Sequence, residues 1–260
     1  MGLGTDSAAA MVGHDKGLAG RMKRINPMLM NVGCIAHRLA LCSSQAADKV
    51  AFLKDYQTTL TSLYTYFKHS SVRCEKLRAM QQVLQEDQIK VKEVYEVRWL
   101  AFYSALDAVF RCLDSLVSYF AQSGDAKDTG LGKKLSDENF VRATYSLMDI
   151  IPIINRLSEY FQKREIDIAY VPVAVRQCLD DLGKVRNEEE THERLLHDVL
   201  AEKKGRLTFK GHVLVKSRRA VSIKEEFIDH IVQNIKKRYF NYLACGIIPK
   251  MVHLQVRYIV

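Results

Sequence analysis

Three short segments of the chain combine residue types that could do chemistry on a nucleic acid. The first, GTDSAAAM at residues 4–11, places Asp6 among small residues at the end of a short strand expected at residues 2–6. A carboxylate in that setting is how two-metal nucleases and transposases hold Mg²⁺ against a scissile phosphate. Asp6 could instead cap a helix that begins near Ser7, and for this segment taken alone capping is the favoured interpretation.

The second segment, CIAHRLAL at residues 34–41, has half the spacing of a zinc site. Cys34 and His37 are two residues of the four that a structural zinc ion needs, and Cys42 would be a third at best, so zinc is not expected. At the start of a helix, Cys34 could pack inward while His37 faces a cleft beside Asp6. A lone histidine there is more often structural than catalytic.

The third segment is Arg98-Trp99, which contains the only tryptophan of the chain. A guanidinium binds phosphate through two parallel hydrogen bonds, and an indole stacks on an unpaired base. The pair could therefore hold a flipped or single-stranded base. The alternative, favoured for the pair alone, makes Trp99 the first core residue of its helix and leaves Arg98 in solvent.

Composition agrees with an acidic partner. The chain has 260 residues, 48% of them hydrophobic, and a formal net charge of +9. This length suits one large domain or two modest ones, and the charge favours DNA, RNA or an anionic surface. The six cysteines are scattered without close pairing, and we expect them to be reduced in an intracellular protein. We expect neither a signal peptide nor a membrane span.

Hydrophobic periodicity predicts a mainly α protein. Short strands are expected at residues 2–6 and 28–33, and a loop at residues 123–134 should divide two helical groups. The clearest amphipathic pattern runs without a break from Ile35 to Phe67 and predicts one long helix. Pro152 is expected inside a helix and Pro172 in the first turn of the next one. The predicted helices are residues 7–24, 35–67, 71–94, 99–120, 136–161, 172–187, 188–204 and 223–239, with strand-like alternation in the basic residues 205–222.

The order of the three segments resembles that of the hAT (hobo/Activator) transposases and of animal genes derived from them. GTDSAAAM looks like the string around the second catalytic aspartate of that family, CIAHRLAL like its Cys-x-x-His string, and VYEVRWLAF at residues 94–102 like its Arg-Trp string. The resemblance implies a partial RNase H-like α/β core at residues 1–70, an all-helical insertion domain at 71–240 and an unassigned tail at 241–260.

The resemblance also implies roles for individual residues. Asp6 matches the second metal-binding carboxylate, and His37 lies near the active site in such proteins. Arg98 and Trp99 match the contact to a DNA end or flipped base, and Cys34 and Arg38 are further candidate DNA contacts. The first and last catalytic carboxylates have no match in this chain, and one carboxylate cannot organise two metal ions. Glu225 and Glu226 are expected to be solvated.

We therefore expect a nuclear protein, or one both nuclear and cytoplasmic, that descends from a transposase and binds DNA without catalysis. The basic excess in residues 203–224 and 236–238 favours DNA contacts. One alternative is a helical scaffold that binds protein partners or copies of itself. The other is an incomplete gene model of an active Mg²⁺-dependent transposase. No cofactor is expected in this chain unless a complete, active form binds Mg²⁺, and neither a membrane nor a small-molecule substrate is expected as a partner.

Overall fold

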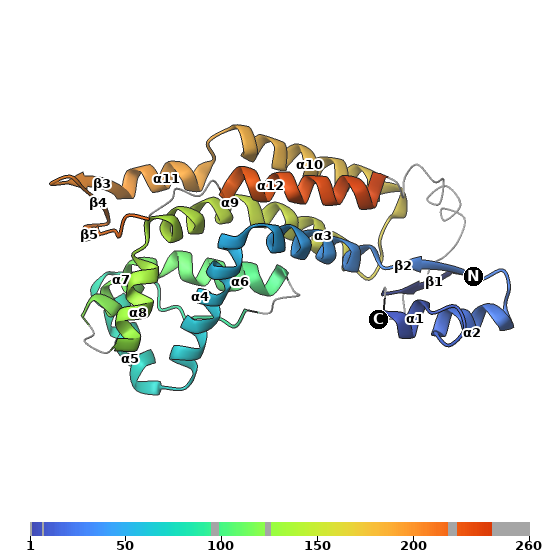
Figure 1. Cartoon of the computed structure of the whole chain (residues 1–260), viewed down its shortest axis with the longest axis horizontal. Coiled ribbons are helices and arrows are strands. Elements are labelled where there is room, and N and C mark those ends of the chain that lie inside the picture. Colours follow the sequence, from blue (N-terminus) through green and yellow to red (C-terminus); the bar gives the residue numbers. More distant parts are fainter. Residues whose placement is uncertain (1, 7, 95–98, 123–125, 218–222, 241–260) are drawn as a thin grey trace.

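A long central helix organises the molecule. In the computed structural model, which describes residues 2–6, 8–94, 99–122, 126–217 and 223–240, α9 (Glu138–Phe161) runs through the middle of a mainly helical body (Figure 1). Asp137 caps α9, since its carboxylate accepts hydrogen bonds from the amides of Asn139 and Phe140. Pro152 lies inside α9, as predicted. The helices packed on α9 include α3 (Ile35–Lys49), α6 (Trp99–Arg111), α10 (Val171–Asn187), α11 (Thr191–Val199) and α12 (Ile223–Ile235).

The single long helix predicted for residues 35–67 is wrong, although its buried face is right. The chain forms α3 and then α4 (Ala51–Lys68), separated by Val50, which has an extended backbone at φ −98° and ψ 97°. Val50 is itself buried. The one-residue break lets α3 pack on α12 while α4 turns toward α5 (Ser71–Val83) and α8 (Ala126–Leu135). All residues of the predicted apolar stripe are buried, namely Ile35, Leu39, Cys42, Ala46, Val50, Leu53, Leu60, Leu63 and Phe67.

The predicted helix at residues 7–24 is also interrupted. It divides into α1 (Ala9–Val12) and α2 (Leu18–Ile25), joined by a turn in which the chain folds tightly on itself. A Cβ atom added to Gly20 would lie 1.9 Å from the carbonyl oxygen of His14, so only glycine fits there.

Of two further predicted helices, one is too long and the other is divided. The predicted helix at 71–94 ends at Val83, after which Glu86 contacts Ser115 and Asp87 contacts Arg111, so tertiary contacts replace the helix. The predicted helix at 99–120 divides at Cys112 into α6 and α7 (Leu113–Ala121).

The loop predicted at residues 123–134 is mostly the helix α8. Leu135 is fully buried, and Gly132 allows α8 to approach α7 closely, since an added Cβ would lie 3.1 Å from that of Phe120. Residues 123–125 lie outside the described part of the chain. The glycines and lysines of this segment predict a loop, but the burial of its leucines favours a helix.

Residues 71–240 are not entirely helical. The helix predicted at 188–204 ends at Val199, and the chain continues into an antiparallel sheet in the order β3 (Leu200–Lys203), β4 (Arg206–Phe209) and β5 (His212–Val213). The strand-like alternation predicted after residue 205 is therefore confirmed in part. The remaining short elements are the 3₁₀ turn η1 (Ile168–Tyr170) before α10 and the π-helical turn η2 (Lys236–Phe240) after α12.

A small N-terminal unit packs separately from the helical body. In it β1 (Gly2–Thr5) pairs in parallel with β2 (Met30–Gly33), and α1 and α2 lie beside them (Figure 1). Both strands were predicted, but their parallel pairing was not. Leu3, Ala19 and Leu29 form its small core, whereas the main core runs from Ile35 to Tyr239 without a break near residue 70. The described residues contain no helix that is both long and apolar enough to cross a bilayer.

Candidate nucleic-acid interface

The parallel strand pair brings the first two segments together. Thr5 at the end of β1 is in register with Gly33 at the end of β2, and the Cys34 amide donates a hydrogen bond of 2.7 Å to the Thr5 carbonyl oxygen. Asp6 follows the first strand and Cys34 follows the second, at the N-terminus of α3. The carboxyl ends of neighbouring parallel strands are where many α/β proteins bind ligands.

Asp6 has a local partner at this edge. Its side chain is exposed, and its Oδ1 accepts a hydrogen bond of 3.1 Å from the amide of Ala8, just before α1 begins. This is an Asx-type turn bond rather than a helix cap, because Ala8 is itself the N-cap residue of α1 and no side chain caps that helix. Among the described residues, no group of three or more His, Cys, Asp and Glu side chains is arranged to hold a metal ion. The residues around Asp6 thus do not fit the ligand set of a two-metal centre, and we derive no catalytic step through one.

Arg38 lies over the end of β2. A Cβ atom added to Gly33 would sit 3.1 Å from both Nε and Nη2 of Arg38, so the guanidinium packs directly on the strand backbone. Cys34 and His37 are half-buried on the same first turn of α3. The edge therefore combines a guanidinium with the amide end of a 15-residue helix, and both attract anions.

Contacts with α12 and η2 hold α3 in place. The Tyr239 hydroxyl donates a hydrogen bond of 2.6 Å to the Ile35 carbonyl oxygen, and Asn234 donates one of 2.9 Å to that of Cys42. Burial raises the pKa of the Cys42 thiol to about 12, although Arg238 and Arg38 act in the opposite direction. Cys42 is thus a buried core thiol that is protonated at neutral pH.

The third segment lies elsewhere in the fold. Arg98 is outside the described residues, and the helix that begins at Trp99, α6, packs on α9, α4 and α7. Figure 1 shows α6 within the helical body, apart from β1 and β2. The roles of Arg98 and Trp99 in base binding therefore remain predictions, as does any role for the tail at 241–260, which is also outside the described residues.

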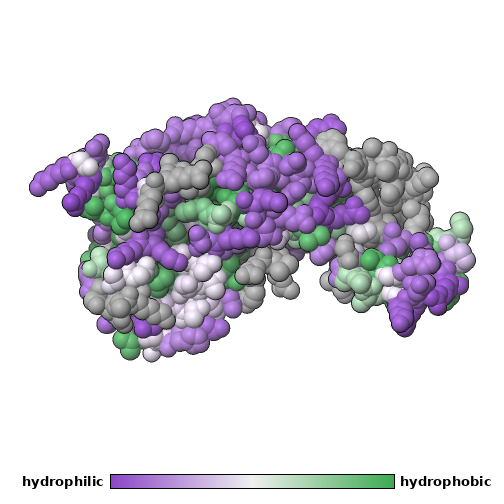
Figure 2. Space-filling model, viewed as in Figure 1, coloured by the Kyte–Doolittle hydropathy of each residue, from purple (hydrophilic) through white to green (hydrophobic). Residues whose placement is uncertain are grey.

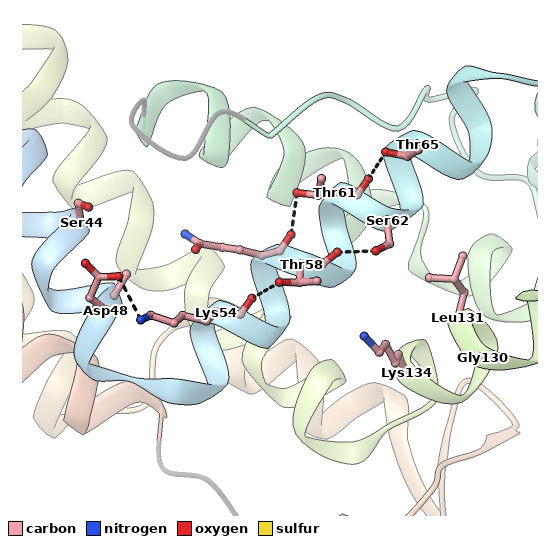
Figure 3. A pocket seen from close by; sticks show the side chains of 12 residues that line it. Ser44, Asp48, Lys54, Thr58, Thr61, Ser62, Thr65, Gly130, Leu131 and Lys134 are labelled. Carbon is pink, nitrogen blue, oxygen red and sulfur yellow. Dashed lines mark hydrogen bonds and ion pairs between the residues drawn. The ribbon is translucent and has the colours of Figure 1, made fainter.

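An open polar groove between α3, α4 and α8 was not predicted. It has a volume of about 830 Å³, and α4 contributes a stripe of hydroxyl groups at helical spacing (Figure 3). Each hydroxyl donates its proton to the carbonyl four residues earlier, so only its oxygen lone pairs face the groove. The hydroxyl oxygens can accept hydrogen bonds, and the lining of the groove also includes Lys134 and Lys54, of which Lys54 pairs with Asp48. Its hydroxyl stripe comprises Thr58, Thr61, Ser62 and Thr65.

A serine, a histidine and an aspartate also meet at the base of the β-sheet. The sequence did not predict this cluster, because its members lie far apart along the chain. Ser118 Oγ lies 3.2 Å and Asp114 Oδ1 3.0 Å from the same atom, Nε2 of His212. A catalytic triad needs the serine and the carboxylate on opposite ring nitrogens. This cluster therefore cannot relay a proton as a triad does, and it joins β5 to α7 instead.

Comparison with known proteins finds no family model and no solved structure that matches the chain. The fold and the site define a mainly helical protein with a small parallel sheet, at whose end a guanidinium and a helix N-terminus lie together. The five described cysteines, Cys34, Cys42, Cys74, Cys112 and Cys178, are free thiols.

Proposed function

We propose that this protein is a DNA-binding derivative of a hAT-type transposase that has lost strand-transfer activity. The observation that carries the proposal is the hydrogen bond between Cys34 and Thr5, because it aligns the two most transposase-like segments at one edge of a parallel sheet. Such an edge is what an RNase H-like remnant would retain. A nuclear location is part of the same proposal.

At this edge, Arg38 and the first turn of α3 are the phosphate contact. The guanidinium offers a fork of donors, and the helix end offers unpaired amides with a partial positive charge. Arg98 and Trp99 supply a second contact, to an exposed base. In this proposal Asp6 has no catalytic role, and its exposed carboxylate accepts a local hydrogen bond from the Ala8 amide.

The test is a titration of labelled duplex DNA, followed by fluorescence anisotropy between about 50 and 200 mM salt. Loss of one phosphate contact in Arg38→Gln should reduce the slope of log affinity against log salt by about 0.9. The control is Arg176→Gln on α10, which removes the same charge from an exposed site far along the sequence. Wild-type binding that is absent, or that ignores salt, would reject the proposal.

A separate arm tests the claim of inactivity. Supercoiled plasmid incubated with Mg²⁺ should stay intact with the wild type and with Asp6→Asn alike. Nicking by the wild type that Asp6→Asn abolishes would show that a metal centre does form. Circular dichroism of each variant verifies that the helical fold is unchanged.

A second candidate function is self-association through the N-terminal unit. Ile25 is 87% exposed and Met28 is 81% exposed, and both lie where α2 leads into β2. Contiguous exposed apolar patches mark interaction surfaces, and we take Ile25 and Met28, three residues apart in the sequence, as the centre of such a surface. Sedimentation velocity of the nuclease-treated protein should then show a concentration-dependent dimer that Ile25→Ser with Met28→Ser removes. A monomer at all concentrations would reject this candidate.

A further inference from the structure

The hairpin of β3 and β4 projects from one end of the helical body. Figure 1 shows the two strands extending beyond α11, and Figure 2 shows that the projection is mostly hydrophilic. Its strands are joined by the two-residue turn Lys204-Gly205, in which both residues have positive φ angles of 52° and 69°. Positive φ at both positions is typical of the type I′ turn, which matches the twist of a β-ribbon.

Cations face each other across the end of this ribbon. Lys203 is paired with Arg206 in the strand register, so the two side chains lie on one face, and both are exposed. Glu202 points to the opposite face, because side chains alternate along a strand. Lys203, Lys204 and Arg206 form no ion pair with any other described residue. Like charges placed directly opposite each other destabilise a hairpin, so folding does not explain this pair.

The first residue of the turn, Lys204, is also unfavourable for folding of the hairpin. Lys204 has a left-handed backbone, which glycine, asparagine and aspartate adopt at lower cost than lysine. The chain therefore has a lysine where a neutral turn residue would fold better. Two independent positions thus give up some stability and gain positive charge at the same tip.

The base of the ribbon is firmly attached. Phe209 is 1% exposed in the main core, and Lys210 lies 3.6 Å from Asp114 and 3.7 Å from Glu86. After β5, the Val215 amide donates a hydrogen bond of 2.8 Å to the Ser136 carbonyl oxygen, just before the start of α9. A charged tip on a fixed base is ordered before it binds, so binding does not carry the entropic cost of ordering a loop.

We propose that the tip of this hairpin, formed by Lys203, Lys204 and Arg206, is a phosphate-binding arm that enters a groove of duplex DNA. A two-stranded β-ribbon fits the major groove, and three cations at its end reach the phosphates that border it. This inference rests on the proposed DNA binding. It places the arm beyond α11, far from β1 and β2 in Figure 1.

The test compares two triple variants with the same change in net charge. The arm variant is Lys203→Gln, Lys204→Asn and Arg206→Gln, and the control is Lys49→Gln, Lys76→Gln and Lys184→Gln, which alters exposed lysines on α3, α5 and α10. Three lost phosphate contacts predict that the ratio of wild-type to arm-variant affinity falls about 40-fold when salt rises from about 50 to about 200 mM. The control ratio should stay nearly constant.

The outcomes separate the two proposals. Duplex binding by the wild type, with equal salt slopes for both triple variants, would overturn the arm and leave DNA binding intact. No duplex binding by the wild type would overturn both. A larger effect of the arm variant on single-stranded RNA than on duplex DNA would also overturn the groove assignment. Far-ultraviolet circular dichroism should be the same for all three proteins, since the altered side chains are exposed. The melting temperature of the arm variant should equal or slightly exceed that of the wild type, because its substitutions remove the like-charge pair and the unfavourable turn residue.

Discussion

Replacing Lys203 should change stability and DNA binding in opposite directions. In the register of the hairpin Lys203 lies directly opposite Arg206. Lys203→Gln removes a like-charge pair, and Lys203→Glu converts it into an ion pair. The order of hairpin stability should therefore be Glu, Gln and Lys from highest to lowest, and the order of affinity for DNA should be the reverse.

The size of the effect follows from Coulomb's law. Two long side chains on opposite residues hold their charges about 7 Å apart, and at that distance two like charges in water repel by about 0.6 kcal/mol. Physiological salt, with a Debye length of about 8 Å, reduces this to roughly 0.25 kcal/mol. Lys203→Gln should recover about this much, and Lys203→Glu about twice as much. Both values lie within the range measured for cross-strand pairs.

Amide hydrogen exchange is the suitable assay because it detects opening of the hairpin without unfolding of the helical body. At low salt, a gain near 1.2 kcal/mol in Lys203→Glu should slow exchange of the amides between β3 and β4 roughly eightfold. The gain should shrink as salt is added. Exchange in Lys203→Glu that is as fast as in the wild type would refute the register or the charge argument. Anisotropy on the same samples measures the opposite trend in DNA binding.

Three further predictions test the core. Tyr56→Phe should lower the free energy of unfolding by about 1 kcal/mol in urea titrations, because its buried hydroxyl bonds Thr144 at 2.9 Å. Leu147→Ala should cost about 2 to 5 kcal/mol in the same assay, since Leu147 is fully buried in α9. Burial raises the pKa of Cys178 to about 12, so its thiolate is scarce at about pH 8 and mass spectrometry should find iodoacetamide on half-buried Cys34 long before Cys178.

Matched controls accompany these variants. Tyr170→Phe removes a hydroxyl from a side chain that is 48% exposed, and Val83→Ala shortens one that is 76% exposed. Each should change the free energy of unfolding by less than about 0.5 kcal/mol. A cost for Tyr170→Phe equal to that of Tyr56→Phe would mean that the buried hydrogen bond is not the cause. Equal labelling of Cys178 and Cys34 would contradict the burial of Cys178.

The sequence predicts which side chains are buried better than it predicts where helices break. The stripe from Ile35 to Phe67 is buried throughout, yet the helix is interrupted at Val50. One extended residue hardly disturbs a spacing of three or four, so periodicity cannot detect it. The break is set by what each half must pack against, and that information belongs to α12 and α8.

Of the candidate site, the sequence predicted the two strands. The expectation of strands before Asp6 and before Cys34 is enough to suggest that the two residues meet, because parallel neighbours align their carboxyl ends. The position of Arg38 over Gly33 depends on a close approach that composition does not encode. The contacts of His212 with Asp114 and Ser118 join residues more than ninety positions apart, beyond the reach of any local pattern.

Local conflicts with folding are a physical guide to function in this chain. Most of the core follows its preferences, with buried apolar stripes and a well-placed cap at Asp137. In the hairpin, by contrast, Lys204 has an unfavourable backbone and Lys203 faces Arg206. Positive φ also occurs at Gln85 and Lys210, but of these three residues only Lys204 adjoins a like-charge pair. Natural sequences tolerate such conflicts mainly where binding or catalysis needs them. Both conflicts concentrate positive charge at one tip, so the binding of a polyanion would explain them both. An unfavourable backbone conformation alone would not indicate what the tip binds.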